Sequence, residues 1–80
     1  MNIGIIKKRG KDWLFTTHYS EHGWSVGSYY PTKKKAYIAA RTALAKDEIK
    51  NIHIYSSRGV YQKCEFNNLI NWTTEPVPVG

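Results

Sequence analysis

The sequence is poor in the residues that mark several large classes of protein. It has one cysteine, Cys64, so it can form no internal disulfide, and it has only three prolines and six acidic residues. The apolar run Ile3 to Ile6 near the start is far too short for a signal peptide. No stretch approaches the roughly 20 apolar residues of a membrane span. We therefore expect a cytoplasmic protein with no membrane partner.

Catalytic and metal-binding patterns are also scarce. Glu21 next to His22, and Asp47 next to Glu48, come nearest to an acid–base pair, but no activated nucleophile accompanies them. No C-x-x-C or helical H-x-x-x-H pattern links the residues suited to zinc. These residues are His18, His22, His53 and Cys64. We expect no enzymatic activity, no metal and no cofactor.

Positive charge is what the sequence does have. Twelve Lys and Arg against six Asp and Glu give a net charge of +6. Residues 1–50 hold ten basic and four acidic residues, whereas residues 51–80 hold two of each, so the whole excess lies in the first part of the chain. A field of this sign favours anionic partners such as nucleic acid, an acidic protein face or anionic lipid. The alternative is that the net charge only keeps a small protein soluble.

Alternation of apolar and polar residues predicts three strands in the first thirty residues. A short strand over residues 3–6 is followed by a polar turn from Lys7 to Asp12, and then by a strand from Trp13 to Tyr19 with aromatic side chains on one face. Ser20 to Gly23 form a second turn, and Trp24 to Tyr30 alternate again. Together these segments predict an antiparallel meander.

A helix and a second hairpin follow. Pro31 ends the third strand, Thr32 offers a side-chain oxygen as a helix cap, and Lys33 to Lys46 are rich in alanine. A stripe of small and apolar residues at helical spacing implies that this helix lies close against a sheet. The stripe is Ala36, Ala39, Ala40, Ala43 and Leu44.

The remaining pattern completes a single α+β domain over residues 1–75. Residues 52–55 and 60–66 predict two strands joined by a turn that contains Gly59. The predicted order is β-β-β-α-β-β, an antiparallel sheet of about five strands with one helix on one face. Residues 76–80 read as an extended tail.

Around the helix the sequence resembles a family of short bacterial and bacteriophage domains of unknown function. The family pattern is a W-x-V strand, a T-x-x-E-A helix start, an A-R pair, and a strand ending in I-H before a glycine turn. The matching residues are Trp24, Val26, Thr32, Ala36, Ala40, Arg41, Ile54 and Gly59. Lys35 stands in place of the family's glutamate and Tyr55 in place of its histidine. The resemblance covers about residues 13–66 and implies the same sheet-plus-helix layout and a phage context, but no function.

Seven of the twelve basic residues fall in two short runs. Lys7, Lys8, Arg9 and Lys11 surround the first turn, and Lys33, Lys34 and Lys35 occupy the first turn of the helix. A helix N-terminus is positive, so each exposed cation there costs about 0.3 to 1 kcal/mol. Such a loss of stability is expected where the lysines bind an anion, because free backbone N–H groups beside lysines form a good phosphate-binding site. If solvent and salt screen the charges, the cost is negligible.

Two further features extend this surface. Arg41 lies about two turns after Lys34 on the same helix face, with Tyr37 between them. Whether the two basic runs meet depends on strand order, which the sequence leaves open. Strand tyrosines next to basic residues offer rings on which single-stranded bases stack, although tyrosine is also an ordinary strand residue. The candidates are Tyr19, Tyr29, Tyr30, Tyr55 and Tyr61, and the set that we favour is Tyr29, Tyr30 and Tyr37.

These observations lead to two hypotheses. The first is a non-catalytic nucleic-acid-binding module of low sequence specificity, with RNA favoured, in which the two basic runs and Arg41 contact phosphates. The second is a small protein-binding inhibitor or adaptor, of the kind that phages use, which docks its basic face on an acidic host protein. Homo-oligomerisation through an exposed edge strand such as Val60 to Phe66 is compatible with either.

Overall fold

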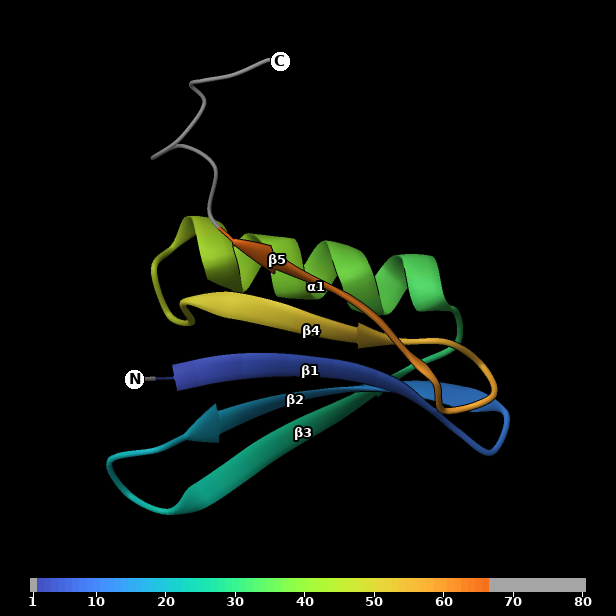
Figure 1. Cartoon of the computed structure of the whole chain (residues 1–80), viewed down its shortest axis with the longest axis horizontal. Coiled ribbons are helices and arrows are strands. Elements are labelled where there is room, and N and C mark those ends of the chain that lie inside the picture. The colour runs from blue at the N-terminus through green and yellow to red at the C-terminus, as the bar shows by residue number, and fades with distance from the viewer. Residues whose placement is uncertain (1, 67–80) are drawn as a thin grey trace.

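The computed structural model describes residues 2–66, which form one five-stranded sheet with a helix on one face (Figure 1). The elements in chain order are β1 (Asn2–Arg9), β2 (Asp12–Tyr19), β3 (Trp24–Tyr30), α1 (Lys33–Ala45), β4 (Asn51–Tyr55) and β5 (Tyr61–Phe66). This order and the packing of α1 confirm the predicted α+β fold. The predicted domain end at residue 75 and the extended tail over residues 76–80 lie outside the described residues.

The sheet is mixed, whereas the sequence pattern predicts a wholly antiparallel one. The strand order is β3-β2-β1-β4-β5, and three of its neighbouring pairs are antiparallel. The central pair, β1 and β4, is parallel. The reason is the crossover through α1, which carries the chain from the end of β3 back to the end of the sheet where β1 begins. From there β4 must run in the same direction as β1.

The first strand is longer than the sequence pattern predicts. β1 continues through Arg9 because its last three residues pair with the start of β2, and the turn between them contains only Gly10 and Lys11. Gly10 has a φ of 61°, a left-handed conformation that glycine adopts without steric cost. Lys7 and Lys8 therefore lie on a strand rather than in a turn, and their side chains point to opposite faces of the sheet.

The core lies between the sheet and α1. Its buried side chains are Ile6, Phe15, Ala36, Ala40, Ala43, Leu44, Ile49, Ile52 and Ile54. The alanines on α1 confirm the predicted stripe, since only small side chains allow a helix to approach a sheet so closely. Gly4 in β1 makes room for Ile49, because an added Cβ would lie only 2.8 Å from Cδ1 of Ile49.

Both ends of α1 are capped. Oγ1 of Thr32 accepts a hydrogen bond from the backbone N–H of Lys35 (3.1 Å), which confirms the predicted cap. At the other end the N–H of Glu48 donates to the carbonyl of Ala43 (2.9 Å), and Asp47 adopts the left-handed conformation that glycine usually provides. The first turn contains no acidic residue, so no carboxylate within α1 offsets its three lysines.

Candidate nucleic-acid interface

Strand direction brings the two basic runs to the same end of the molecule. β1, β3 and β4 end there, β2 begins there, and α1 also begins there, at the right of Figure 1. The β1–β2 turn and the first turn of α1 are therefore neighbours in space. We name this surface the basic end, and its residues are Lys7, Lys8, Arg9, Lys11, Lys33, Lys34 and Lys35.

Trp13 is the point at which the two runs meet. Nζ of Lys8 lies 5.9 Å from the centroid of a Trp13 ring, and Nζ of Lys33 lies 5.2 Å from it. Both distances are in the range of a cation–π interaction. Because Trp13 packs against the core, its ring holds one lysine from each run in place. The two runs therefore meet at Trp13, and this meeting depends on the strand order and on the register of the β1–β2 hairpin.

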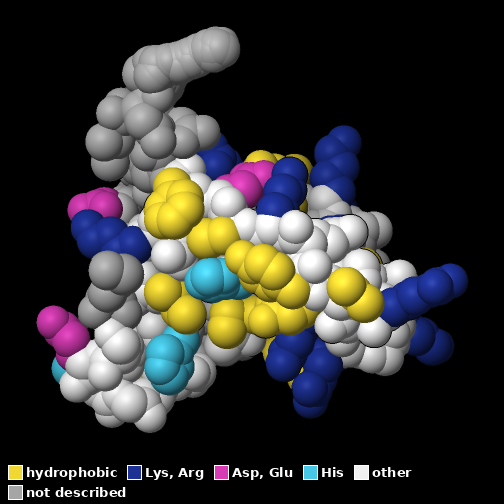
Figure 2. Space-filling view, viewed as in Figure 1, with side chains coloured by type: hydrophobic (Ala, Val, Ile, Leu, Met, Phe, Trp, Pro, Cys, Tyr) yellow, Lys and Arg dark blue, Asp and Glu magenta, His cyan; other side chains and the backbone are white. Residues whose placement is uncertain are grey.

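Acidic residues are concentrated away from the basic end. Among residues 2–66, Asp12 is the only acidic residue at the basic end. Glu21 lies in the β2–β3 turn, and Asp47 and Glu48 follow α1, all at the opposite end of the sheet. Figure 2 shows Lys and Arg side chains projecting on the side of the β1–β2 turn, with no Asp or Glu among them in this view. This separation of charge along the strands strengthens the positive field at one end.

Arg58 is a candidate that the sequence reasoning missed. It lies in the turn between β4 and β5, and because β4 runs parallel to β1 this turn is also at the basic end. In the sequence Arg58 stands alone among Ser57 and Gly59, so no run of charge marks it. Only the parallel pairing of β4 with β1 reveals its position.

Arg41 lies on the predicted side of α1, but its charge is partly neutralised. Its Nη1 atom lies 3.4 Å from Oε1 of Glu65, and Nζ of Lys63 lies 2.9 Å from Oε2 of the same residue. The hydroxyl of Tyr37 also donates to Glu65 (2.6 Å). Arg41 therefore ties α1 to β5 and contributes less to the basic end than Lys34 or Lys35.

Glu65 is held ionised by this cluster. Burial acts to raise the pKa of Glu65, but hydrogen bonds from Tyr37 and Lys63, together with the charges of Lys63 and Arg41, outweigh it. The pKa of Glu65 therefore lies below its ordinary value. In the same cluster, burial and the neighbouring carboxylate raise the pKa of the Tyr37 hydroxyl.

The lowered pKa of Glu65 predicts a loss of stability in acid. A carboxyl group with a depressed folded pKa stabilises the fold fully above its unfolded pKa, about 4.3 for glutamate, and this stabilisation is lost as the pH falls through the folded value. We expect Glu65→Gln to melt at a lower temperature than the wild type at neutral pH, and the difference to shrink below about pH 4. Thermal melts of both proteins across this range test it. A difference that is independent of pH would contradict it.

The three favoured stacking tyrosines do not share one surface. Tyr30 and Tyr37 pack against the core and expose little of their rings. Tyr29 is 62% exposed on the face of the sheet away from α1. Alternation along β3 places Tyr29 and Tyr30 on opposite faces, so of the three only Tyr29 has a ring open to a ligand.

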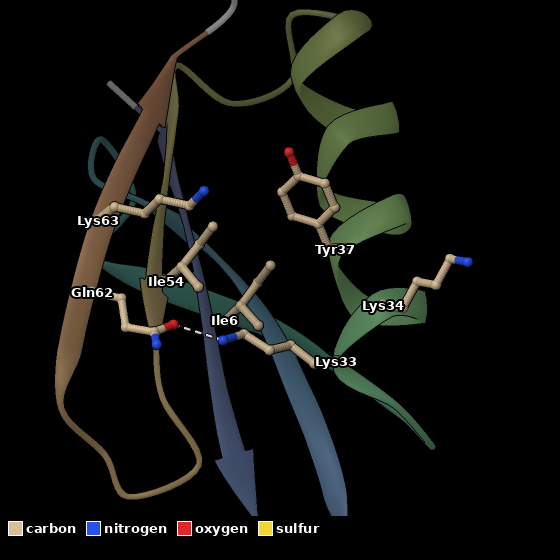
Figure 3. A pocket seen from close by; sticks show the side chains of 7 residues that line it. All are labelled: Ile6, Lys33, Lys34, Tyr37, Ile54, Gln62 and Lys63. Carbon is tan, nitrogen blue, oxygen red and sulfur yellow. Dashed lines mark hydrogen bonds between the residues drawn. The ribbon is translucent and has the colours of Figure 1, made fainter.

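A groove opens between α1 and β5 beside the basic end (Figure 3). Its volume is about 570 Å³, and Ile6 and Ile54 line it with apolar surface. Nζ of Lys33 donates across it to Oε1 of Gln62 (2.6 Å), whereas Lys34 points away from it. Lys33 is thus shared between Gln62 and Trp13, and Lys34 is the better placed of the two to meet a phosphate.

Comparison with known proteins gives no relative: no family model, no curated protein and no solved structure matches the chain. Within residues 2–66, no helix is long and apolar enough to cross a membrane. The same part of the chain contains no group of three or more His, Cys, Asp or Glu side chains arranged to hold a metal ion.

Proposed function

We propose that this protein is a non-catalytic nucleic-acid-binding module whose basic end contacts the phosphate backbone. The observation that supports the proposal is the meeting of the two basic runs around Trp13, with Arg58 in the adjoining turn. Most of these cations are lysines, which act as point charges rather than as paired donors fitted to one base. Contacts of this kind position a nucleic acid without reading its sequence, so we expect low sequence specificity.

A salt titration tests this proposal. If the basic end neutralises roughly three to six phosphates, the logarithm of the association constant falls with the logarithm of salt concentration with a slope of about −2 to −5. Fluorescence anisotropy of a labelled oligonucleotide at increasing salt measures this slope. An affinity that does not change with salt would sink the proposal.

The edge strand β3 favours a second candidate, a small protein-binding inhibitor or adaptor. β3 contains no charged residue and no proline, and every residue except Tyr30 is exposed. An edge of this kind is a ready template for a strand of another chain. β5 forms the other edge, as predicted, but it carries Lys63 and Glu65. A host protein that added a strand to β3 would bring its own acidic surface near the basic end.

Co-purification separates the two candidates. The nucleic-acid proposal predicts an absorbance excess at about 260 nm that nuclease removes, because nucleotides absorb there and are held mainly by charge. The adaptor proposal predicts a stoichiometric protein partner that nuclease does not release.

A further inference from the structure

The face of the sheet away from α1, which we name the open face, is not covered by any described element. Strand alternation assigns its residues, because the side chain of Ile6 points toward α1 and its neighbours in β1 point away. The apolar and aromatic residues of the open face are Ile3, Ile5, Leu14, His53 and Tyr55 on the three inner strands, with Tyr29 and Tyr61 on the two edge strands. Figure 2 shows apolar side chains gathered over this face around a histidine.

Rings from β4 and β5 form a contiguous cluster on the open face. The ring of Tyr61 lies 5.9 Å from that of His53 and 5.4 Å from that of Tyr55, centroid to centroid. Nδ1 of His53 lies 3.3 Å from the hydroxyl of Tyr61. Tyr61 is nevertheless 48% exposed. Tyr61 thus contacts two neighbouring rings and still leaves about half of its surface open to a ligand.

The charges around this cluster are positive. Lys7 and Arg9 point to the open face from β1, at the basic end. Among the described strands the carboxylates belong to Asp12 and Glu65, and only Asp12 lies on the open face, at its rim opposite Arg9. Glu65 pairs with Ile52 and faces α1. The open face thus combines aromatic rings with flanking cations. Among the described strands, only Asp12 at its rim adds a carboxylate to it.

A ligand that matches such a surface carries flat π-systems along a polyanionic backbone, as a single-stranded nucleic acid does. A duplex matches it less well, because its bases are stacked inside and it presents mainly phosphates. A second copy of the chain laid face to face would bury His18, His53 and Lys7, and burying polar or charged groups without partners costs free energy.

We propose that the open face binds a single-stranded nucleic acid, with bases stacked on Tyr61 and Tyr29 and the backbone directed toward Lys7 and Arg9. This inference rests on the proposed function, because the same basic end supplies the phosphate contacts. It adds the class of nucleic acid and the residues that contact the bases. Stacking on a ring is tolerant of base identity, in keeping with low sequence specificity.

The test compares single and double strands of one length. We expect the wild type to bind a labelled 12-nucleotide oligouridine, a length of about the usual site size, at least about 10-fold more tightly than a 12-base-pair duplex. The double variant Tyr29→Leu, Tyr61→Leu keeps apolar bulk but removes the rings. It should bind the single strand about 5- to 100-fold more weakly and leave the affinity for the duplex unchanged.

Trp24→Leu is the matched control, because it removes an exposed aromatic ring from the opposite face of β3 and should leave the affinity for the single strand unchanged. Melting temperatures confirm that each variant is folded. NMR spectra give a second readout, in which the ring protons of Tyr61 shift when the oligouridine is added to the wild type.

Each outcome bears on one proposal or on both. Salt-dependent binding that is equal for single strand and duplex, or that the tyrosine variant retains, would overturn the open-face proposal and leave the proposed function standing. Salt-independent binding, or no binding, to either ligand would overturn both. Wild-type protein that sediments as a dimer, with the tyrosine variant a monomer, would assign the open face to a second copy instead.

Discussion

From the proposed function, we expect the replacement of Lys34 and Lys35 by glutamate to lower the affinity for nucleic acid by about 100-fold at low salt and to raise the melting temperature. The affinity falls because two exposed cations at the basic end become anions facing phosphates. The stability rises because anions at a helix N-terminus are favoured by its dipole, and a glutamate at position 35 would close a capping box with Thr32. The gain in stability is about 1 to 2 kcal/mol. At roughly 4 to 8 °C per kcal/mol for a domain of this size, the melting temperature should rise by about 4 to 16 °C.

The control is Lys46→Glu, Lys50→Glu, which changes the net charge by the same amount at the opposite end of the molecule. Lys46 caps the C-terminal end of α1, and Nζ of Lys50 lies 3.5 Å from Oδ1 of Asp47, so these reversals should destabilise the protein slightly and change affinity little. Anisotropy and thermal melts of both variants measure the two effects. An equal loss of affinity in both would show that overall charge, rather than the basic end, attracts the ligand.

The opposite signs of the two effects are the informative part of this experiment. If these lysines served only solubility, replacing them would raise the stability of the protein and lower no binding affinity. Lysines that bind phosphate give up stability in the free protein and recover it in the complex. Lys33 is left unchanged because its contacts with Trp13 and Gln62 would confuse the two effects.

Local patterns predicted the elements of the fold because they report the repeat of a helix or a strand directly. The alanine stripe of α1 describes one buried face, and the alternation in residues 13–30 correctly predicts β2 and β3, although nearly all of β3 is exposed. The parallel pairing of β1 with β4 was not predictable in this way. It joins segments separated by about forty residues, and it is set by the crossover of α1 rather than by any pattern within either strand.

The candidate site also has parts that local sequence predicts and parts that depend on strand pairing. The lysines at the start of α1 are visible in the sequence because they contradict the helix dipole. Their meeting with Lys8 over Trp13 depends on the hairpin register, which continues β1 past the point where charged residues suggest a turn. The sequence names Tyr29, Tyr55 and Tyr61 as stacking candidates but does not show which rings lie together, since a register shift between Ile54 and Tyr55 is what brings Tyr61 opposite Tyr55.

Ala40→Leu tests the packing on which the basic end depends. Ala40 is fully buried in the contact between α1 and the sheet, so a leucine there must push the helix outward or strain its neighbours. Overpacking of this kind costs about 1 to 3 kcal/mol. For a small domain we expect a fall in melting temperature of roughly 5 to 20 °C by circular dichroism.

Ala45→Leu provides the comparison, because residue 45 is the exposed last residue of α1 and the same added volume meets only solvent. Its melting temperature should stay close to that of the wild type, as for most exposed substitutions. Equal stability of the two variants would contradict the close contact of helix and sheet. That contact also fixes the start of α1 beside β1, so a displaced helix in Ala40→Leu should separate Lys33 from Trp13 and weaken the proposed binding although every lysine of the basic end is intact.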